Sequence, residues 1–161
     1  MVGWLNIIYY IIIFIMTIKI DWVLNNEIAI GPAPKNIEDI DKLKTNNIVS
    51  VLCLCSEEEN PFENNFHEYF KFKRFVLPDH KHNRAPTIKE LNSALEALSI
   101  IKKFGPVYVH CVAAIERSPL VCMGWLVRNN NLNPTQALEY MKSIHPRTNP
   151  LPGQLALLNH L

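Results

Sequence analysis

The chain has 161 residues, enough for one domain with a single hydrophobic core. Hydrophobic residues make up 48% of it and charged residues 19%, a composition that excludes an intrinsically disordered protein. The formal net charge is only +1, so we expect no nucleic-acid partner. The four cysteines form no CxxC pair, which indicates reduced thiols and a cytoplasmic location.

An uncharged apolar segment occupies the N-terminus, from residue 2 to residue 18. As a helix it would span about 25 Å, slightly less than the core of a bilayer. It has neither the basic flank nor the small-residue cleavage site of a signal peptide. Three interpretations stay open: a membrane anchor that leaves Lys19 on the cytoplasmic side, an apolar element that packs on the domain, and a dispensable extension ahead of Met16. Residues 1–18 are therefore set apart from a domain at 19–161.

Strands and helices alternate in the first half of that domain. An Asn25–Asn26 turn joins two short strands, and Asn36 can cap a helix whose apolar residues recur every three or four positions. A continuous apolar and β-branched run follows, as in a strand buried on both faces. The predicted elements are two strands within 20–31, a helix over 37–43, a strand at 47–55, an acidic loop at 57–59, a short helix near 62–69 and a strand at 70–78.

The second half continues this alternation. Thr87 and Glu90 form the capping box of a long amphipathic helix, which Gly105 ends. The predicted elements are this helix over 87–105, a strand at 106–111, helices at 117–129 and 134–145, and a last helix within 151–161. The order predicts an α/β fold: a single three-layer domain whose central, mostly parallel sheet of about four to five strands is flanked by helices.

The stretch PVYVHCVAAIERSPLV, residues 106–121, carries the candidate chemistry. Cys111 ends a predicted strand, and Arg117 begins the next helix. A loop of this kind points backbone N–H groups at one spot, where they and the helix dipole bind an anion and favour a cysteine thiolate. Arg117 can grip two oxygens of a tetrahedral anion. A nucleophile in such a loop suits attack on phosphorus and a cysteinyl-phosphate intermediate. The residues that would bind phosphate are Val112, Ala113, Ala114, Ile115, Glu116 and Arg117.

A structural interpretation of these residues has to be weighed. A single cysteine at the end of a buried strand is most often a small core residue. The Cys-x5-Arg spacing alone arises by chance in roughly one chain in ten of this composition. His110 before the cysteine and Ser118 after the arginine make the pattern far more specific.

The stretch HCVAAIERSP resembles the signature loop of the cysteine-dependent protein tyrosine phosphatase superfamily, and most closely that of its dual-specificity branch. VLPDHK resembles the general-acid loop of that branch and places Asp79 32 residues before Cys111. IAIGPAPKNIEDIDKLKTNNIVSVLCL resembles the branch's opening, and RTNPLPGQLALL its closing segment. The resemblance covers Ile28 to Leu158, so residues 19–161 read as a dual-specificity phosphatase-like catalytic domain.

The resemblance implies a role for each matching residue. Cys111 would be the nucleophile, and Arg117 with the amides of residues 112 to 117 would hold the phosphoryl oxygens. Asp79 would protonate the leaving oxygen and then activate water. Ser118 would assist the release of phosphate, and His110 would orient the loop. The implied substrate is a phosphorylated protein or a small phosphomonoester, with no metal or cofactor; we expect a monomer.

Two loop residues depart from the pattern of the branch. Ala114 stands where a glycine is usual, and if the site requires positive φ, alanine costs about 1 kcal/mol there. Glu116 would oppose an anion if it faced inward. We therefore expect it to point away and to brace Arg117 or the loop amides.

Two further hypotheses concern side chains near the loop. Cys53 and Cys55 share one face of a strand, and Cys55 lies at the same sheet edge as Cys111, so a reversible Cys55–Cys111 disulfide could protect the thiolate. Two buried structural thiols are the simpler alternative. His80, Lys81, His82 and Arg84 could recruit an acidic phosphorylated substrate, or they could form an ordinary solvated loop.

Other functions stay open at this point. Rhodanese-type sulfurtransferases also place a cysteine in an anion-binding loop, although Asp79 and Ser118 argue against that class. A phosphate-binding module without activity is disfavoured because Cys111, Arg117 and Asp79 are all present. A phosphatase for lipid, nucleotide or sugar phosphates is compatible with the same loop.

Overall fold

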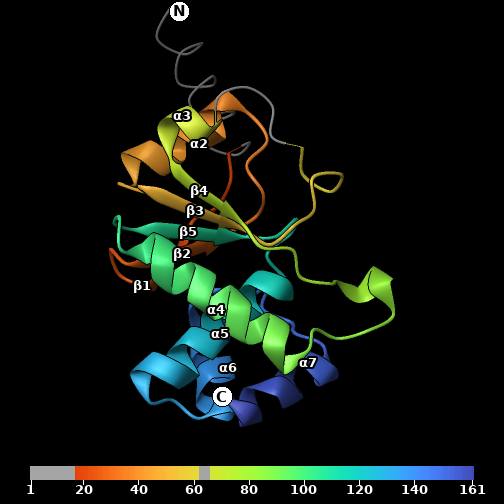
Figure 1. Ribbon diagram of the computed structural model, residues 1–161. Coiled ribbons are helices and arrows are strands. Elements are labelled where there is room, and N and C mark those ends of the chain that lie inside the picture. The colour runs from red at the N-terminus through yellow and green to blue at the C-terminus, as the bar shows by residue number, and fades with distance from the viewer. Residues whose placement is uncertain (1–16, 62–65) are drawn as a thin grey trace, which may run out of the picture.

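A five-stranded sheet forms the centre of the protein (Figure 1). The structure, a computed structural model, describes residues 17–61 and 66–161. The strand order is β1-β2-β5-β3-β4, in which only the β1–β2 pair is antiparallel. The prediction of a mostly parallel sheet is thus confirmed. The strands are β1 (Asp21–Leu24), β2 (Ile28–Gly31), β3 (Ser50–Cys53), β4 (Lys71–Arg74) and β5 (Val107–His110).

Helices cover both faces of the sheet, which confirms the three-layer arrangement (Figure 1). One face packs on α2, whose Ile40 and Leu43 are buried against Val51 and Tyr108. The other face carries the larger core, to which α4, α5 and α6 contribute. The helices are α2 (Ile37–Thr45), α3 (Phe66–Tyr69), α4 (Ile88–Lys102), α5 (Arg117–Asn130), α6 (Pro134–Ile144) and α7 (Pro152–Leu157), with 3-10 turns η1 (His80–His82) and η2 (Leu158–His160).

Local sequence explains most element boundaries. The predicted capping box at Thr87 and Glu90 is present at the start of α4, and the Asn36 side chain accepts a hydrogen bond from the amide of Asp39 in α2. Asn26, in the turn between β1 and β2, adopts φ 57°, a left-handed conformation that asparagine tolerates.

The strands predicted at 47–55 and 70–78 are shorter in the structure; the first is regular only over Ser50–Cys53. The strand predicted at 70–78 is regular only over Lys71–Arg74. The amide of Phe75 still donates to Cys53 and that of Leu77 to Leu54. The chain then leaves the sheet at Pro78, which has no N–H to donate. Of the helix predicted near 62–69, the described part is α3; residues 62–65 lie outside the described chain.

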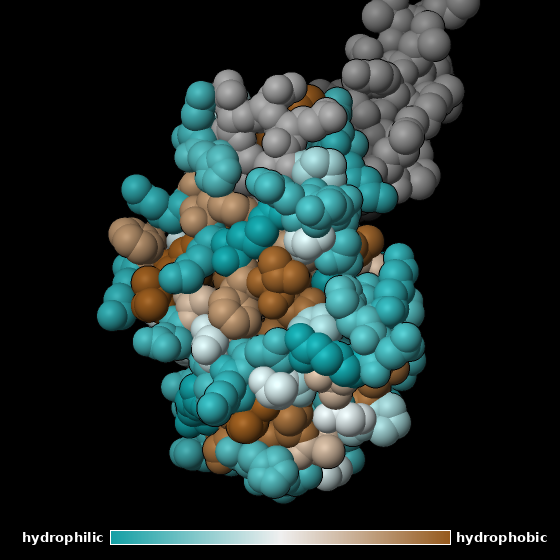
Figure 2. Space-filling view, turned by 45° about the vertical axis from the view of Figure 1, so that its right-hand side comes forward, coloured by the Kyte–Doolittle hydropathy of each residue, from teal (hydrophilic) through white to brown (hydrophobic). Residues whose placement is uncertain are grey.

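The predicted apolar segment 2–18 lies outside the described residues except for its last two. Ile18 is buried, and its amide donates to Asp39 Oδ1 at 2.9 Å, while Thr17 Oγ1 accepts from Lys42. Both residues therefore dock on α2. Within residues 17–61 and 66–161, no helix combines the length and the apolar character needed to cross a bilayer. On the face shown in Figure 2, hydrophilic and apolar side chains are interspersed.

The sheet register brings the chemically interesting residues to one edge. His110 pairs with Gly31 on one side and with Cys53 on the other, at the carboxyl ends of three parallel strands. Loops that follow these ends meet at this edge, which is where α/β folds commonly place their sites.

Candidate active site

A hollow of about 180 Å³ opens at this edge, where the chain passes from β5 into α5. Cys111, at its base, is only 3% exposed, and the loop from Val112 to Glu116 curves around it. The hollow is lined by Glu59, Asp79, His80, Lys81, Cys111, Val112, Ala113, Ile115, Glu116 and Arg117. The structure thus brings the predicted nucleophile, arginine and acid into one small space.

Two neighbours contact the Cys111 residue directly. The Ser118 hydroxyl donates to Cys111 Sγ at 3.3 Å from the first turn of α5. His110 Nδ1 lies 3.2 Å from the carbonyl oxygen of Cys111. Both neighbours are fully buried, so the thiol is held in a fixed position between β5 and α5.

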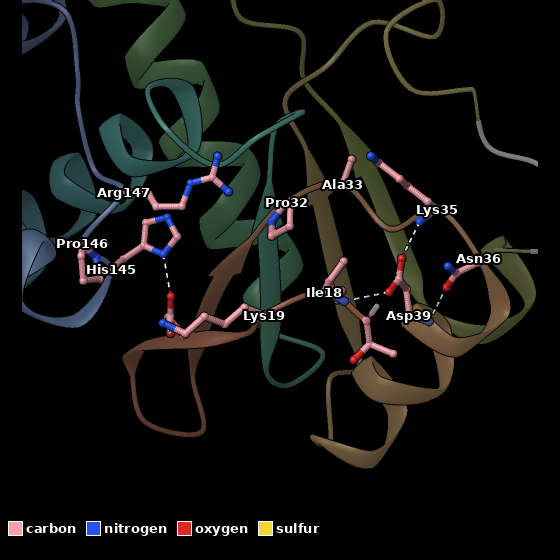
Figure 3. Close-up of a pocket in the computed structure, with 12 residues that line it drawn as sticks. Ile18, Lys19, Pro32, Ala33, Lys35, Asn36, Asp39, His145, Pro146 and Arg147 are labelled. Atoms are coloured by element: carbon pink, nitrogen blue, oxygen red, sulfur yellow. Dashed lines mark hydrogen bonds and ion pairs between the residues drawn. The ribbon is translucent and has the colours of Figure 1, made fainter. Parts of the chain in front are cut away.

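Ala114 adopts a left-handed conformation with φ 55°, so the position does require positive φ, as the usual glycine suggested. Its carbonyl oxygen lies 2.7 Å from His145 Nε2, and His145 Nδ1 lies 2.7 Å from Asp21 Oδ2. The His145 ring thus lies within hydrogen-bond distance of both the loop carbonyl and the Asp21 carboxylate, and Figure 3 marks the contact with the carboxylate by a dashed line. A buried histidine at the end of α6 therefore joins β1 to the loop at its strained residue.

Further hydrogen bonds hold the loop from outside. The Ala33 amide donates to the Val112 carbonyl at 3.1 Å, and the Asn149 amide donates to the Ile115 carbonyl at 2.8 Å. The loop conformation is therefore determined by contacts from β1, from the turn after β2 and from the segment after α6, as well as by its own sequence.

Arg117 is only 2% exposed, and Glu59 is its main partner. Arg117 Nη1 and Nη2 donate to the two Glu59 carboxylate oxygens at 2.9 and 2.8 Å. Nη1 also approaches the carbonyl oxygens of Leu54 and Leu77 at 3.3 and 3.2 Å. The hydrogen bonds from Arg117 lower the pKa of Glu59. The acidic loop recognised in the sequence thus positions the guanidinium, a role that the sequence did not reveal.

Asp79 presents its two carboxylate oxygens differently. Oδ1 accepts from the Lys81 amide at 2.9 Å and lies 2.8 Å from His82 Nδ1, which makes Asp79 the N-cap of η1. Oδ2 lies 3.8 Å from Arg117 Nη2. Burial by itself would raise the pKa of Asp79, but the hydrogen bonds from His82 and Lys81 and the charge of Arg117 outweigh it and lower the pKa.

Glu116 lines the hollow, and its predicted partner was wrong. Its Oε1 accepts from the His80 amide at 3.0 Å, and it braces neither Arg117 nor the loop amides. The bond spans 36 residues, so local sequence gave no sign of it. The loop that carries Asp79, residues 78–84, is here called the acid loop. Glu116 attaches the acid loop to the predicted phosphate-binding loop at 112–116.

The predicted basic rim of the acid loop is only partly present. His80 and Lys81 line the hollow. Arg84 instead donates to both carboxylate oxygens of Glu90, at 2.8 and 2.9 Å, and so braces the start of α4.

Cys53 and Cys55 lie together beneath the hollow, fully buried, and both are free thiols. Cys55 shares a hydrogen bond with Cys53, and this bond together with burial raises the pKa of Cys55. The sulfurs and one His110 nitrogen lie within 4.8 Å of one another, as do side-chain donor atoms of Asp79, His80 and Glu116. These two groups are the candidate metal ligands among the described residues.

Comparison with known proteins agrees with this geometry. The family described as "Dual specificity phosphatase, catalytic domain" matches residues 30–161. The chain belongs to this family, which confirms the resemblance seen in its sequence.

Individual relatives show how far the similarity extends. Dual specificity protein phosphatase PHS1 of Arabidopsis thaliana is 27% identical over 81% of the chain and 14% of its own length. Phosphatidylglycerophosphate phosphatase PTPMT2 of the same plant is 23% identical over 92% of the chain and 66% of its own length. The human tyrosine phosphatase-like serine/threonine/tyrosine-interacting protein superposes with a TM-score of 0.76 at 19% identity, covering 88% of this chain and 93% of that one. The chain thus spans only a small part of PHS1 and less than two thirds of PTPMT2.

Proposed function

We propose that this protein is a cysteine-dependent phosphatase that hydrolyses phosphomonoesters of phosphorylated proteins, on tyrosine, on serine and threonine, or on both. The observation that carries the proposal is the shared hollow: the Cys111 thiol, the Arg117 guanidinium and the Asp79 carboxylate all line it. Membership of the dual specificity phosphatase family supports the same activity.

In the proposed first step, the Cys111 thiolate attacks phosphorus, and the S–P bond forms as the bond to the leaving oxygen breaks. Loop amides and Arg117 stabilise the charge on the three equatorial oxygens. Asp79 gives its proton to the leaving oxygen. Asp79 Oδ2 suits this role, because the contacts of the Asp79 carboxylate with the Lys81 amide and with His82 both use Oδ1.

In the proposed second step, Asp79 takes a proton from water, and that water attacks the cysteinyl phosphate. The S–P bond breaks and inorganic phosphate leaves. The Ser118 hydroxyl, 3.3 Å from Cys111 Sγ, stabilises the departing thiolate. His110 holds the loop through the carbonyl of Cys111. These steps need no metal or cofactor.

A phosphatase for phospholipid monoesters is the second candidate. The similarity to PTPMT2, named as a phosphatidylglycerophosphate phosphatase, covers 92% of this chain. A sulfurtransferase is disfavoured because that reaction gives Asp79 no proton to transfer. We propose a cytoplasmic, monomeric enzyme in which residues 1–18 are either a membrane anchor or a dispensable extension. A chain that begins at Met16 and keeps full activity and solubility would favour the dispensable extension.

The decisive experiment compares wild type, Cys111→Ser and Asp79→Asn on p-nitrophenyl phosphate, on phosphotyrosine and phosphoserine peptides and on a phospholipid monoester. Cys111→Ser should abolish turnover. Asp79→Asn should lower kcat most for poor leaving groups, by about 100-fold, because they depend most on the general acid. Equal activity of wild type and Cys111→Ser would overturn the mechanism, and thiocyanate formation from thiosulfate and cyanide would favour a sulfurtransferase.

A further inference from the structure

Two thiols and one imidazole form a buried group beneath the candidate active site, and the proposed reaction uses neither thiol. Cys53, Cys55 and His110 are all fully buried, and one donor atom of each lies within 4.8 Å of the other two. Cys53 makes side-chain hydrogen bonds with both Cys55 and His110. These three residues are here called the thiol–imidazole cluster.

The pairing of two strands builds this cluster. Cys53 pairs with His110 across the parallel β3–β5 ladder, so the two side chains leave the sheet on the same face. The Leu54 amide donates to the His110 carbonyl at 2.9 Å, which continues the ladder by one residue. Cys55, two positions after Cys53, therefore returns to that face. Sites built on strands hold their ligands more precisely than sites built on loops.

The separation of the three donor atoms suits a metal ion. An ion at the centre of atoms no more than 4.8 Å apart lies within about 2.8 Å of each, and a metal–sulfur bond is roughly 2.3 Å long. Side-chain shifts of about 0.5 Å close that difference. The ion takes the place of the hydrogen atoms between the donors, so the packed core needs no additional cavity.

The surroundings of His110 match those of a metal-binding histidine. Its Nδ1 lies 3.2 Å from the carbonyl oxygen of Cys111. Metal-binding histidines usually turn one ring nitrogen to a carbonyl or carboxylate and bind the ion through the other nitrogen. Tyr108 stacks on the His110 ring, with 5.9 Å between the centroids, and so holds the plane of the imidazole. His110 can therefore present Nε2 to an ion.

The donor set selects among the metals. Thiolate sulfur and imidazole nitrogen are ligands of both copper and zinc. Structural zinc sites almost always have four ligands, whereas three donors of the described chain meet here. All three residues are 0% exposed, so no solvent water adds a fourth ligand. Three soft donors without water favour monovalent copper over zinc.

We propose that Cys53, Cys55 and His110 form a structural binding site for one Cu(I) ion. Both thiols release their protons as the ion binds, and the copper keeps its oxidation state. The ion connects β3 to β5 beneath Cys111, and through His110 it holds the Cys111 carbonyl in place. In the copper form, Cys55 is not available to form a disulfide with Cys111.

The test uses the full chain with Cys111→Ser, because this change removes the thiol in the neighbouring hollow. The reduced, metal-free protein receives Cu(I) without oxygen, both in its folded state and during refolding from denaturant, and is then desalted. We expect one copper per chain. Bound copper should raise Tm by about 5–10 °C, because an ion that binds only the folded state stabilises it.

Three further variants of this protein locate the ion. Cys53→Ser and Cys55→Ser should each retain less than about one tenth of the copper, because each removes a thiolate ligand. Cys122→Ser removes another fully buried thiol and should retain all of it. X-ray absorption at the copper edge needs no change in the cluster, so it decides the matter even if the first two variants do not fold. It should show two sulfur neighbours and one nitrogen neighbour.

The measurements need no phosphatase activity, so they stand apart from the proposed function. Absence of retained copper after both treatments would overturn the site. Full retention of copper by Cys53→Ser or Cys55→Ser, or a spectrum with fewer than two sulfur neighbours, would overturn it as well. A protein that retains zinc from Zn(II) but no copper from Cu(I) would show that the assignment to copper is wrong.

Discussion

His145 Nε2 lies 2.7 Å from the carbonyl oxygen of Ala114, the left-handed residue of the loop around Cys111. The other ring nitrogen, Nδ1, lies 2.7 Å from Asp21 Oδ2. This buried contact couples the end of α6 and strand β1 to the geometry of the candidate site. His145 is therefore a positioning residue for the loop amides.

Replacing His145 by alanine should lower stability and activity together. Loss of a buried hydrogen-bond partner costs about 1–3 kcal/mol, and a less ordered amide loop should lower kcat by about tenfold. Tyr140→Phe is a matched control, because it removes the Tyr140 hydroxyl bond to the Val23 carbonyl, also from α6 to β1, without touching the loop. Thermal unfolding and steady-state kinetics measure both effects. A His145→Ala variant whose kcat equals that of Tyr140→Phe would show that His145 is only structural.

Glu59→Gln tests how the guanidinium of Arg117 is held. Glutamine keeps the shape but replaces one acceptor oxygen with a donor group, so the paired bonds at 2.8 and 2.9 Å cannot both persist. We expect kcat to fall by about tenfold, because Arg117 is less well aligned with the transition state. Glu58→Gln, at an exposed neighbouring position, is the control and should behave like wild type. Unchanged kinetics of Glu59→Gln would contradict this role.

The pH dependence of the reaction should respond to His82. Hydrogen bonds from His82 and Lys81 and the charge of Arg117 lower the pKa of Asp79 despite its burial. Because the acid is active only when protonated, kcat/KM for a poor leaving group should decrease as pH rises through this lowered pKa. His82→Ala removes a bond that favours the carboxylate, so the pKa of Asp79 should rise and the decreasing limb should move to higher pH. His160→Ala, far along the chain in η2, is the control; a limb at the same pH in all three proteins would exclude the His82 effect.

Ala114 and Ala113 should respond oppositely to glycine. Ala114 has φ 55°, and glycine at this position removes a strain of about 1 kcal/mol. Ala113 does not have positive φ, so glycine there only increases the entropy of the unfolded chain, which lowers stability. Ala114→Gly should therefore be more stable than Ala113→Gly by about 1 kcal/mol, which corresponds to roughly 2–4 °C in Tm. Chemical denaturation of the two variants measures the difference. Equal stabilities would mean that the loop relaxes around Ala114.

Cys55 is proposed as the redox partner of Cys111. Peroxide would oxidise the Cys111 thiolate to a sulfenic acid, and the Cys55 thiolate would then attack that sulfur and displace hydroxide. Burial and the bond to Cys53 raise the pKa of Cys55, so the second reaction should speed up with rising pH. Cys55→Ser should lose activity irreversibly in peroxide, whereas dithiothreitol should restore the wild type; Cys122→Ser, at another buried thiol, is the control. Equal recovery of wild type and Cys55→Ser would rule out the bridge.

Sequence patterns predicted the features that depend on residues close together in the chain, such as the loop around Cys111 and the helix caps. The loop from Cys111 to Arg117 is contiguous, so its residue pattern placed the proposed nucleophile and the arginine at the end of one strand. The caps of α2 and α4 follow from residues three positions apart. Even the left-handed position of Ala114 followed from the place of a usual glycine.

Contacts between distant segments could not be predicted in the same way. Glu59 lies 58 residues before Arg117, and Asp21 lies 124 residues before His145. Such pairings depend on the order of the strands in the sheet, and the hydrophobic periodicity of a single segment does not predict that order. One signal was present for Glu59: it follows β3 at the carboxyl edge of the sheet, where parallel strands collect functional side chains.

The shorter of the two contacts between Glu116 and residue 80 uses the backbone amide, at 3.0 Å, and the ring Nδ1 of His80 lies 3.4 Å from the same carboxylate oxygen. That amide exists whatever residue stands there, except proline. A change at position 80 would therefore remove the ring contact and keep the amide bond, whereas position 116 has to retain a hydrogen-bond acceptor. Relatives that lack an acceptor at the position of Glu116 should carry a different tether between the two segments.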